Sequence, residues 1–178
     1  MQFREKRPWT TRELVDEAAV VRSAIGERAS LVVNDRVDVA AAIGADAVHL
    51  GRNDLSPAVA RRLLGSDVLI GATANDLQEA RRIGCSGIDY LGAGPVFGTA
   101  SKANPAPALG LDGLRAIVEA VDVPVIAIGS IDAERVREVI ATGVHGIAVL
   151  SAVVAANDPA SAARRIREAL DSTRAQAR

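Results

Sequence analysis

The sequence has little of what marks several classes of protein. Its 178 residues include one cysteine, Cys85, and two histidines. A single cysteine cannot form an internal disulfide, and no cysteine or histidine has a neighbour at the spacing of a zinc site. We therefore predict no disulfide framework and no zinc site, and we interpret Cys85 as a small, partly buried residue near the end of a helix.

Long apolar runs and an excess of one charge are also missing. No stretch of 18 apolar residues occurs, so we predict no membrane span, and the first residues lack the apolar segment of a secretory signal. With 21 basic against 22 acidic residues, the net charge is -1, which does not favour a nucleic-acid partner. We expect a cytoplasmic protein, and the sequence is compatible with a homo-oligomer.

Aromatic residues are scarce at 2%, although hydrophobic residues make up 49% of the chain. The core must therefore consist of Ala, Val, Leu and Ile, as in buried parallel sheets and the helices that cover them. The length suits one domain with a sizeable core, so we predict a single domain over residues 1–178.

Short apolar runs alternate with longer segments of helical spacing. The runs predict strands at residues 31–33, 47–50, 68–70, 88–91, 124–128 and 146–150, and residues 1–4 resemble the tail of a seventh. Helices are predicted at residues 10–24, 56–64, 77–83, 111–120, 133–141 and 159–170. Thr10 and Glu13 are predicted to form a capping box at the start of the first helix. Pro57 occupies the first position of the second predicted helix, where proline is favoured.

Strand and helix alternation of this kind requires parallel strands joined by crossovers. A Gly-Ala-Asp-like phrase recurs at residues 44–46, 87–89 and 143–146, which favours repeated βα units over one doubly wound sheet. We therefore predict an α/β fold of the TIM-type (β/α) barrel class with about seven parallel strands. Because a complete barrel has eight strands, we expect it to be incomplete at its N-terminus.

Active sites of such barrels lie where the strands end, and polar residues follow the predicted strands. Asp35 and Asp54 follow neighbouring strands, and paired carboxylates suit Mg²⁺ that also binds a substrate phosphate. Each has an alternative interpretation, since Asp35 could cap the next helix and Asp54 could be a turn residue.

Cations and hydroxyls follow other predicted strands. Arg4, Lys6 and Lys102 suit a diphosphate, although each could instead be a solvated surface residue. Ser130 and Ser151 follow the last two strands, where this fold commonly binds phosphate. His49 lies within an apolar strand and is interpreted as a hydrogen-bonded core residue. We expect no covalent nucleophile.

Six segments, in order along the chain, resemble the motifs of thiamine phosphate synthases. Residues 2–6 resemble Q-L-R-E-K and residues 34–38 resemble N-D-R-x-D. Residues 49–54 resemble H-L-G-Q-x-D and residues 94–102 resemble G-P-[IV]-F-x-T-x-T-K. Residues 127–131 resemble A-I-G-G-I, and residues 149–152 resemble V-x-S-A. The ordered set is highly specific, although each segment alone is only moderately so.

This resemblance implies a Mg²⁺-dependent transferase that couples a pyrimidine diphosphate to a thiazole phosphate. Asp35 and Asp54 would bind Mg²⁺, while Arg4 and Lys102 would stabilise the leaving diphosphate. Thr73 would take the place of a serine that contacts the pyrimidine. The implied substrate-binding residues are Gln2, Phe3, Arg4, Glu5, Lys6, Asn34, Thr73, Thr99, Ala100, Ser101, Lys102, Ser130, Leu150 and Ser151.

The sequence departs from the family pattern in three ways. Arg52 replaces a glutamine, Ser130 replaces the second glycine of G-G, and the strand and helix that normally precede Q-L-R-E-K are absent. Three alternatives stay open. One is a non-catalytic phosphate-binding relative, another is a thiazole tautomerase, and the third is a different phosphate-binding barrel enzyme. The tautomerase would have a histidine where this chain has Asn75.

Overall fold

The computed structural model describes residues 1–84, 86–98 and 106–176. Contacts divide the chain into two units, which are described separately below. The first comprises residues 1–73 and 86–90, and the second comprises residues 74–85 and 91–178. The prediction of a single domain over residues 1–178 stays a prediction.

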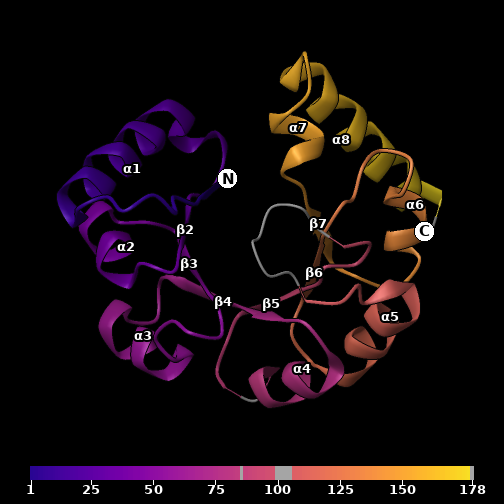
Figure 1. Cartoon of the computed structure of the whole chain (residues 1–178), viewed down its shortest axis with the longest axis horizontal. Helices are drawn as coiled ribbons and strands as arrows, with labels where there is room; N and C mark the ends of the chain where they lie inside the picture. The colour runs from indigo at the N-terminus through magenta and orange to yellow at the C-terminus, as the bar shows by residue number, and fades with distance from the viewer. Residues whose placement is uncertain (85, 99–105, 177–178) are drawn as a thin grey trace. The chain divides into compact units, whose positions relative to one another are not determined.

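The first unit contains a parallel sheet whose strands pair in chain order (Figure 1). Its strands are β1 (Gln2–Phe3), β2 (Val32–Asn34), β3 (Ala47–Leu50) and β4 (Leu69–Ala74), the last of which ends at the first residue of the second unit. The intervening helical elements are α1 (Thr11–Ile25), the short 3₁₀ helix η1 (Gly26–Arg28), α2 (Val37–Ile43) and α3 (Pro57–Leu64).

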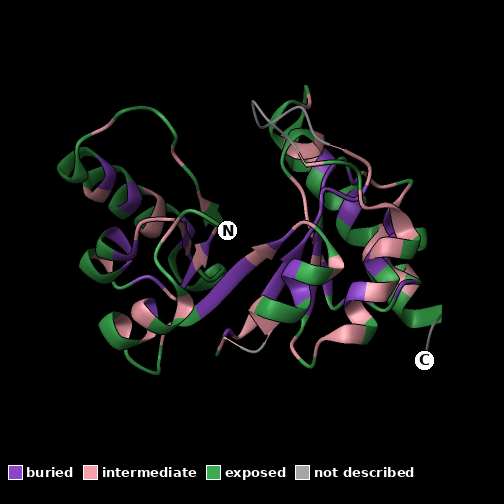
Figure 2. Cartoon of the chain, turned by 60° about the horizontal axis from the view of Figure 1, so that its bottom comes forward, coloured by how far each residue is buried: buried purple, intermediate pink, exposed green. Residues whose placement is uncertain are grey.

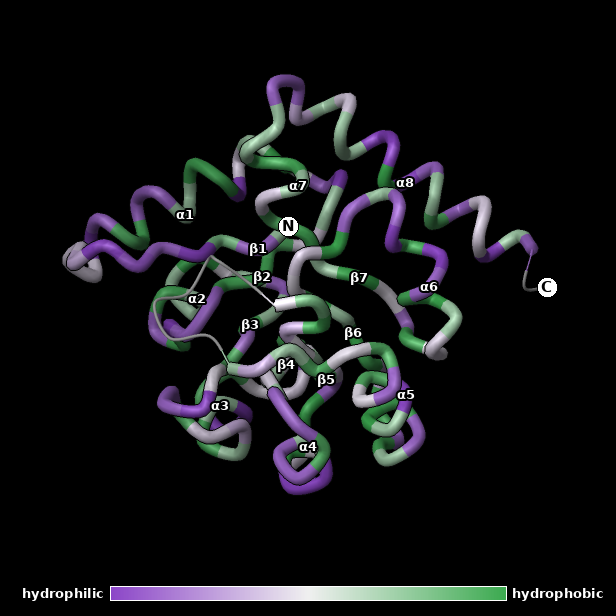
Figure 3. The backbone as a smooth tube through the Cα atoms, turned by 45° about the vertical axis from the view of Figure 1, so that its right-hand side comes forward, coloured by the Kyte–Doolittle hydropathy of each residue, from purple (hydrophilic) through white to green (hydrophobic). Residues whose placement is uncertain are grey.

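Local signals in the sequence set where these helices begin. Thr10 caps α1 and forms the predicted capping box, in which its hydroxyl accepts from the Glu13 N–H and its own N–H donates to the Glu13 carboxylate. Ser56 caps α3 with its hydroxyl alone, which accepts from the Val59 N–H at 3.4 Å, and Pro57 is the first residue of that helix. Hydrophilic and hydrophobic residues alternate along α1 (Figure 3), as expected of a helix with one face on a core.

The two faces of this sheet differ in composition. Val33, Val48 and Ile70 lie in one row across β2, β3 and β4, and each is at most 1% exposed. Helix α2 packs on β2 and β3, and buried residues lie on both the strands and the helices (Figure 2). Because side chains alternate along a strand, the row formed by Asn34, His49 and Gly71 faces the other side.

The recurring Gly-Ala-Asp-like phrase has a structural reason in this unit. Asp46 and Asp89 each lie just before a strand, where the carboxylate accepts a backbone N–H of the preceding strand segment and pairs with an arginine of a helix. The two sets are Asp46 with Leu31 N and Arg22, and Asp89 with Ile70 N and Arg61. One aspartate therefore ties strand to helix in successive βα units.

The second unit repeats the same plan. It contains strands β5 (Tyr90–Ala93), whose first residue belongs to the first unit, β6 (Val125–Ile128) and β7 (Gly146–Ala148), again parallel and paired in order. Its helices are α4 (Leu77–Gly84), α5 (Gly110–Ala120), α6 (Val136–Ile140), α7 (Ser151–Val154) and α8 (Pro159–Gln176). Helix α8 packs against α6 and α7.

The described residues confirm an α/β fold with seven parallel strands linked through helices, as in the TIM-type class. Several predicted boundaries were wrong. Strand β4 extends to Ala74, beyond the predicted range of 68–70, so Thr73 lies within the strand, and β5 begins at Tyr90 and not at residue 88. Helices α2 and α7 were not among the predicted ranges, α6 is shorter and α8 longer. Among the described residues, no helix is long and apolar enough to cross a membrane.

Candidate functional site

Three charged side chains come together beyond the ends of β1, β2 and β3 in the first unit. The Lys6 ammonium donates to Asp35 Oδ2 and forms an ion pair with it. The carboxyl groups of Asp35 and Asp54 lie close enough for each to shift the pKa of the other. Asp54 Oδ2 also accepts the Gly51 N–H at 2.6 Å. The structure thus places the two predicted metal-binding aspartates side by side, next to a predicted phosphate-binding lysine.

The backbone of Asp35 has an unusual conformation that aims this side chain. Its φ is 66°, in the left-handed region where Asp and Asn are the most tolerated residues after glycine. A hydrogen bond of 2.8 Å from Arg36 N to Asn34 O closes a three-residue turn around it, and Asp35 N donates to His49 O at 2.8 Å. Such strained residues cluster at functional sites.

The structure decides between the alternative interpretations of the two aspartates. Helix α2 begins at Val37 without a side-chain cap, so Asp35 is not its capping residue. Asp54 does close a turn, because its N–H donates to Gly51 O at 3.2 Å while its carboxylate accepts from Gly51 N. For Asp54, the turn therefore holds the carboxylate beside Asp35.

The two carboxyl groups have opposite pKa shifts. Burial and then the neighbouring Asp35 raise the pKa of Asp54. Burial also acts to raise the pKa of Asp35, but hydrogen bonds from Lys6 and Asp54 and the charge of Arg4 together hold it below its ordinary value. The site thus carries one more negative charge than it readily accommodates, which is the electrostatic condition that a bound cation relieves.

The donor set suits a hard divalent cation. Carboxylate oxygens are ligands that Mg²⁺ prefers, and Mg²⁺ commonly keeps water and substrate phosphate in its remaining positions. Among the described residues, no group of three or more His, Cys, Asp or Glu side chains could hold a metal. A cation at Asp35 and Asp54 would therefore depend on water or phosphate for most of its ligands.

The other predicted residues of the first segment have different environments. Gln2 and Arg4 are exposed, and Phe3 is half-buried. Glu5 turns its carboxylate into its own loop, where it accepts from Lys6 N at 2.8 Å and Arg7 N at 2.7 Å. Hydrogen bonding from the Arg7 guanidinium and these backbone groups lowers the pKa of Glu5 to about 2. In the structure Glu5 therefore orders the loop that carries Lys6.

Thr73 and His49 are connected on β4 and β3. His49 Nε2 lies 2.8 Å from Thr73 Oγ1, and His49 Nδ1 lies 3.0 Å from the Tyr90 hydroxyl. Both ring nitrogens of His49 are hydrogen-bonded, as predicted, but the side chain is half-buried and so is not the core residue that was predicted. Sequence reasoning did not identify Tyr90, because it lies 41 positions beyond His49 and belongs to no motif that names a partner.

In the second unit, the ends of β5 and β6 approach each other closely. A Cβ added at Gly129 would lie 2.6 Å from Pro95 Cα and 2.8 Å from Val96 N, so only glycine fits. Val96 N donates to Ile128 O at 2.9 Å, and Phe97 N donates to Gly129 O at 3.3 Å. These bonds fix the start of the loop that begins at residue 94.

Ser130 has a φ of 50° and follows Gly129 at the end of β6. Its hydroxyl donates to Gly98 O at 3.0 Å. Arg135 donates to Ser130 O at 2.7 Å, while its guanidinium carbon lies 4.6 Å from the centre of the Phe97 ring. The residue that replaces a family glycine therefore links the two loops.

Ser130→Ala is expected to destabilise the protein by about 1 kcal/mol, because the hydrogen bond to Gly98 is lost while the left-handed strain stays. Ser130→Gly loses the same bond but also releases the strain, so its unfolding free energy should stay near that of the wild type. Urea denaturation of the two variants measures the difference. Equal losses in both would show that Ser130 is not strained.

Of the remaining predicted substrate-binding residues, two lie in the part of the chain that the structure describes and four do not. Leu150 precedes α7 and is 49% exposed, and Ser151 is the first residue of that helix and exposed. Thr99, Ala100, Ser101 and Lys102 lie outside the described residues. Their roles as substrate-binding residues stay predictions.

Asn75 lies at the position where a tautomerase would have a histidine. Its side-chain amide donates to Gly94 O, and its backbone N–H donates to the buried Glu79 at 2.8 Å. A carboxamide is neither protonated nor deprotonated near neutral pH, and this one holds the loop at Gly94 through its hydrogen bond. Asn75 therefore lacks the acid–base group that tautomerisation would require.

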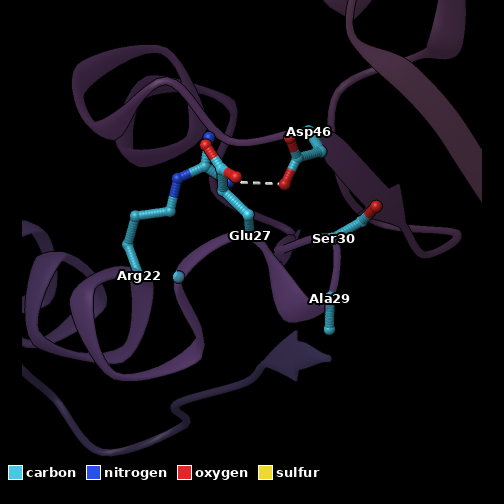
Figure 4. A pocket seen from close by; sticks show the side chains of 6 residues that line it. Arg22, Glu27, Ala29, Ser30 and Asp46 are labelled. Carbon is cyan, nitrogen blue, oxygen red and sulfur yellow. Dashed lines mark hydrogen bonds and ion pairs between the residues drawn. The ribbon is translucent and has the colours of Figure 1, made fainter.

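A hollow of about 360 Å³ lies at the opposite ends of the strands in the first unit (Figure 4). It is lined by Arg22, Gly26, Glu27, Ala29, Ser30 and Asp46. Arg22 and Asp46 form an ion pair across it, and Asp46 also accepts Leu31 N at 2.6 Å. In this fold class the amino ends of the strands serve stability, so this hollow is not the candidate site.

Comparisons with known proteins point to one family. The model of the family described as thiamine monophosphate synthase matches residues 1–153. The thiamine-phosphate synthase of Chloroflexus aurantiacus is 46% identical over 99% of this chain and 82% of its own length. That of Moorella thermoacetica is 44% identical over 98% and 83%. The solved thiamine phosphate pyrophosphorylase of Pyrococcus furiosus superposes with a TM-score of 0.86 at 41% identity, covering 97% of this chain and 82% of that one. The chain belongs to the thiamine monophosphate synthase family.

Proposed function

We propose that the protein is a thiamine-phosphate synthase whose coupling reaction requires Mg²⁺. It joins 4-amino-2-methyl-5-(diphosphooxymethyl)pyrimidine to 4-methyl-5-(2-phosphooxyethyl)thiazole. The bond between the pyrimidine methylene and the diphosphate oxygen breaks, and the diphosphate leaves with the electron pair. The thiazole nitrogen then forms the new C–N bond with its lone pair. The products are thiamine phosphate and diphosphate.

One observation supports this proposal most directly, namely the group formed by Lys6, Asp35 and Asp54. Departure of a diphosphate places negative charge on oxygens near this group, so catalysis needs fixed positive charge there. No enzyme nucleophile is needed, because the thiazole nitrogen itself attacks the pyrimidine methylene. Lys6 supplies such a charge, and its ion pair with Asp35 fixes its position. Identities of 46% and 44% with two thiamine-phosphate synthases over almost the full chain add independent support for the reaction.

Asp35 and Asp54 are the residues that would hold Mg²⁺. Their contact and the raised pKa of Asp54 fit a cation at this point. When bound, Mg²⁺ would supply charge neutralisation at the diphosphate. The chain's own residues then bind and orient the substrates, with Arg4 and Lys6 directed at the diphosphate. Lys102 is proposed to join them, and Asn34 precedes Asp35 in the turn that presents both.

The thiazole phosphate is proposed to bind the second unit at the ends of β6 and β7. Gly129 and Ser130 both have positive φ at the end of β6, and we propose that backbone N–H groups of this bend bind the phosphate, as such groups do elsewhere without a cation. Because the Ser130 hydroxyl donates to Gly98 O, we assign its contribution to the backbone rather than to the hydroxyl. Leu150 and Ser151 are proposed to complete this phosphate site.

The reaction is tested by mixing the purified protein with both substrates and Mg²⁺ and measuring thiamine phosphate. We expect product with Mg²⁺, no product with excess EDTA, and recovery when Mg²⁺ is restored. Circular dichroism of the same samples checks that EDTA leaves the fold unchanged. Undiminished product in EDTA would contradict the metal requirement, and no product from folded protein under any condition would contradict the coupling reaction itself.

A further inference from the structure

A hydrogen-bonded array on the first unit connects Tyr90, His49 and Thr73. The Tyr90 hydroxyl lies 3.0 Å from His49 Nδ1, and His49 Nε2 lies 2.8 Å from Thr73 Oγ1. The ring centres of His49 and Tyr90 are 5.5 Å apart. Three side chains from β3, β4 and the start of β5 therefore share one line of hydrogen bonds.

The sheet register makes this array feasible. His49 pairs with Gly71 across β3 and β4, and Thr73, two residues further along β4, lies on the same face. A Cβ added at Gly71 would lie 2.0 Å from Tyr90 Cζ. The Tyr90 ring therefore lies directly over Gly71, and the missing side chain at Gly71 allows the phenol to reach His49.

The direction of the protons along the array follows from the partners available. Burial raises the pKa of Tyr90 to about 12, so the phenol keeps its proton near neutral pH. Within the described residues, His49 Nδ1 is the hydrogen-bond partner given for the Tyr90 hydroxyl, and the histidine tautomer decides which of the two donates. Leaving the phenol O–H without an acceptor in this half-buried place is unfavourable, so we infer that Tyr90 donates and Nδ1 accepts. The histidine proton then resides on Nε2, which donates to Thr73 Oγ1.

We propose that His49 and Tyr90 are positioning residues that set the Thr73 hydroxyl as a donor toward a ring nitrogen of the pyrimidine substrate. With its oxygen accepting from His49, the Thr73 proton is directed to another acceptor. The unprotonated ring nitrogens of an aminopyrimidine are such acceptors, whereas its exocyclic amine is a donor. This inference rests on the proposed function, since it assigns the pyrimidine to Thr73.

Tyr90→Phe tests the array because it removes one hydroxyl and keeps the ring over Gly71. We expect the Kd for the pyrimidine diphosphate, measured by calorimetry with Mg²⁺, to rise about tenfold, the loss of one good hydrogen bond. The Kd for the thiazole phosphate should not change. Thr73→Val should show a similar loss, Thr73→Ser should bind as the wild type does, and Tyr90→Phe should add little to Thr73→Val.

The tautomer gives a readout that needs no ligand and no turnover. Long-range ¹H–¹⁵N NMR of the ligand-free protein should show His49 protonated at Nε2 in the wild type and a mixture of tautomers in Tyr90→Phe. A wild-type proton on Nδ1, or equal pyrimidine affinity in wild type and Tyr90→Phe, would overturn the inference. Absence of thiamine phosphate in the coupling assay, with these shifts and affinities as expected, would instead contradict only the proposed reaction.

Discussion

Asp54→Asn is expected to lower the rate of thiamine phosphate synthesis at least about 100-fold while raising the melting temperature of the metal-free protein. The amide removes a charge that the proposed Mg²⁺ site needs. It also removes the repulsion that, with burial, raises the pKa of Asp54, and its oxygen can still accept the Gly51 N–H. Because Asp54 is only partly buried, we expect a rise on the order of 1–3 °C in calorimetry.

The pH dependence of this gain has a definite sign. A raised folded-state pKa contributes stability below the unfolded pKa, and this contribution is lost as the pH rises through the folded pKa. At neutral pH the ionised Asp54 is therefore unfavourable, and the asparagine variant has its full advantage there. Below about pH 3.9, where the aspartate is also protonated in the unfolded chain, the two proteins should melt at similar temperatures.

Asp35→Asn is the matched control, since it should also lose activity but change stability in the opposite direction. The pKa of Asp35 is held below its ordinary value despite burial, chiefly through Lys6, so its ionised form stabilises the fold at neutral pH. Asparagine tolerates the left-handed backbone at this position, which isolates the effect of charge. Equal melting temperatures for both variants, or full activity in either, would contradict the assignment of this pair.

Gly71→Ala is expected to destabilise the protein by about 1–3 kcal/mol, as overpacking of a filled core does. The new methyl group would lie 2.0 Å from Tyr90 Cζ and 2.5 Å from both Cε atoms, so the ring must move. Unfolding in urea measures the loss. Displacement of Tyr90 should also weaken binding of the pyrimidine diphosphate through His49.

Gly146→Ala is a suitable control, because Gly146 is also a strand glycine, but among the described residues its added Cβ would meet Ile126 Cδ1 alone, at 3.4 Å. Replacing it should be neutral or slightly stabilising, since alanine has less freedom to lose on folding. In a Tyr90→Ala background the cost of Gly71→Ala should largely disappear. A cost that persists without the ring would mean that strand propensity, and not Tyr90, decides this position.

The sequence predicted the local structure where chemistry near the residue itself sets it. The capping box at Thr10 and the Ser56-Pro57 start of α3 are local hydrogen bonds and a fixed φ, and both are present. Predictions failed where packing sets the boundary. Strand β4 extends through Gly71 to Ala74, because ladder pairing with β3 and contact with Tyr90 offset the weak strand preference of glycine and alanine.

The sequence likewise predicted that Lys6, Asp35 and Asp54 lie together, because residues that follow successive parallel strands meet at one edge of the sheet. Only the tertiary structure revealed that Asp35 adopts a left-handed conformation, that Asp54 takes the raised pKa, and that Ser130 links two loops. The sequence also did not predict the hydrogen-bonded array from Tyr90 to Thr73. Its members become neighbours through strand register and a missing side chain, which are properties of the packed sheet and of no single segment.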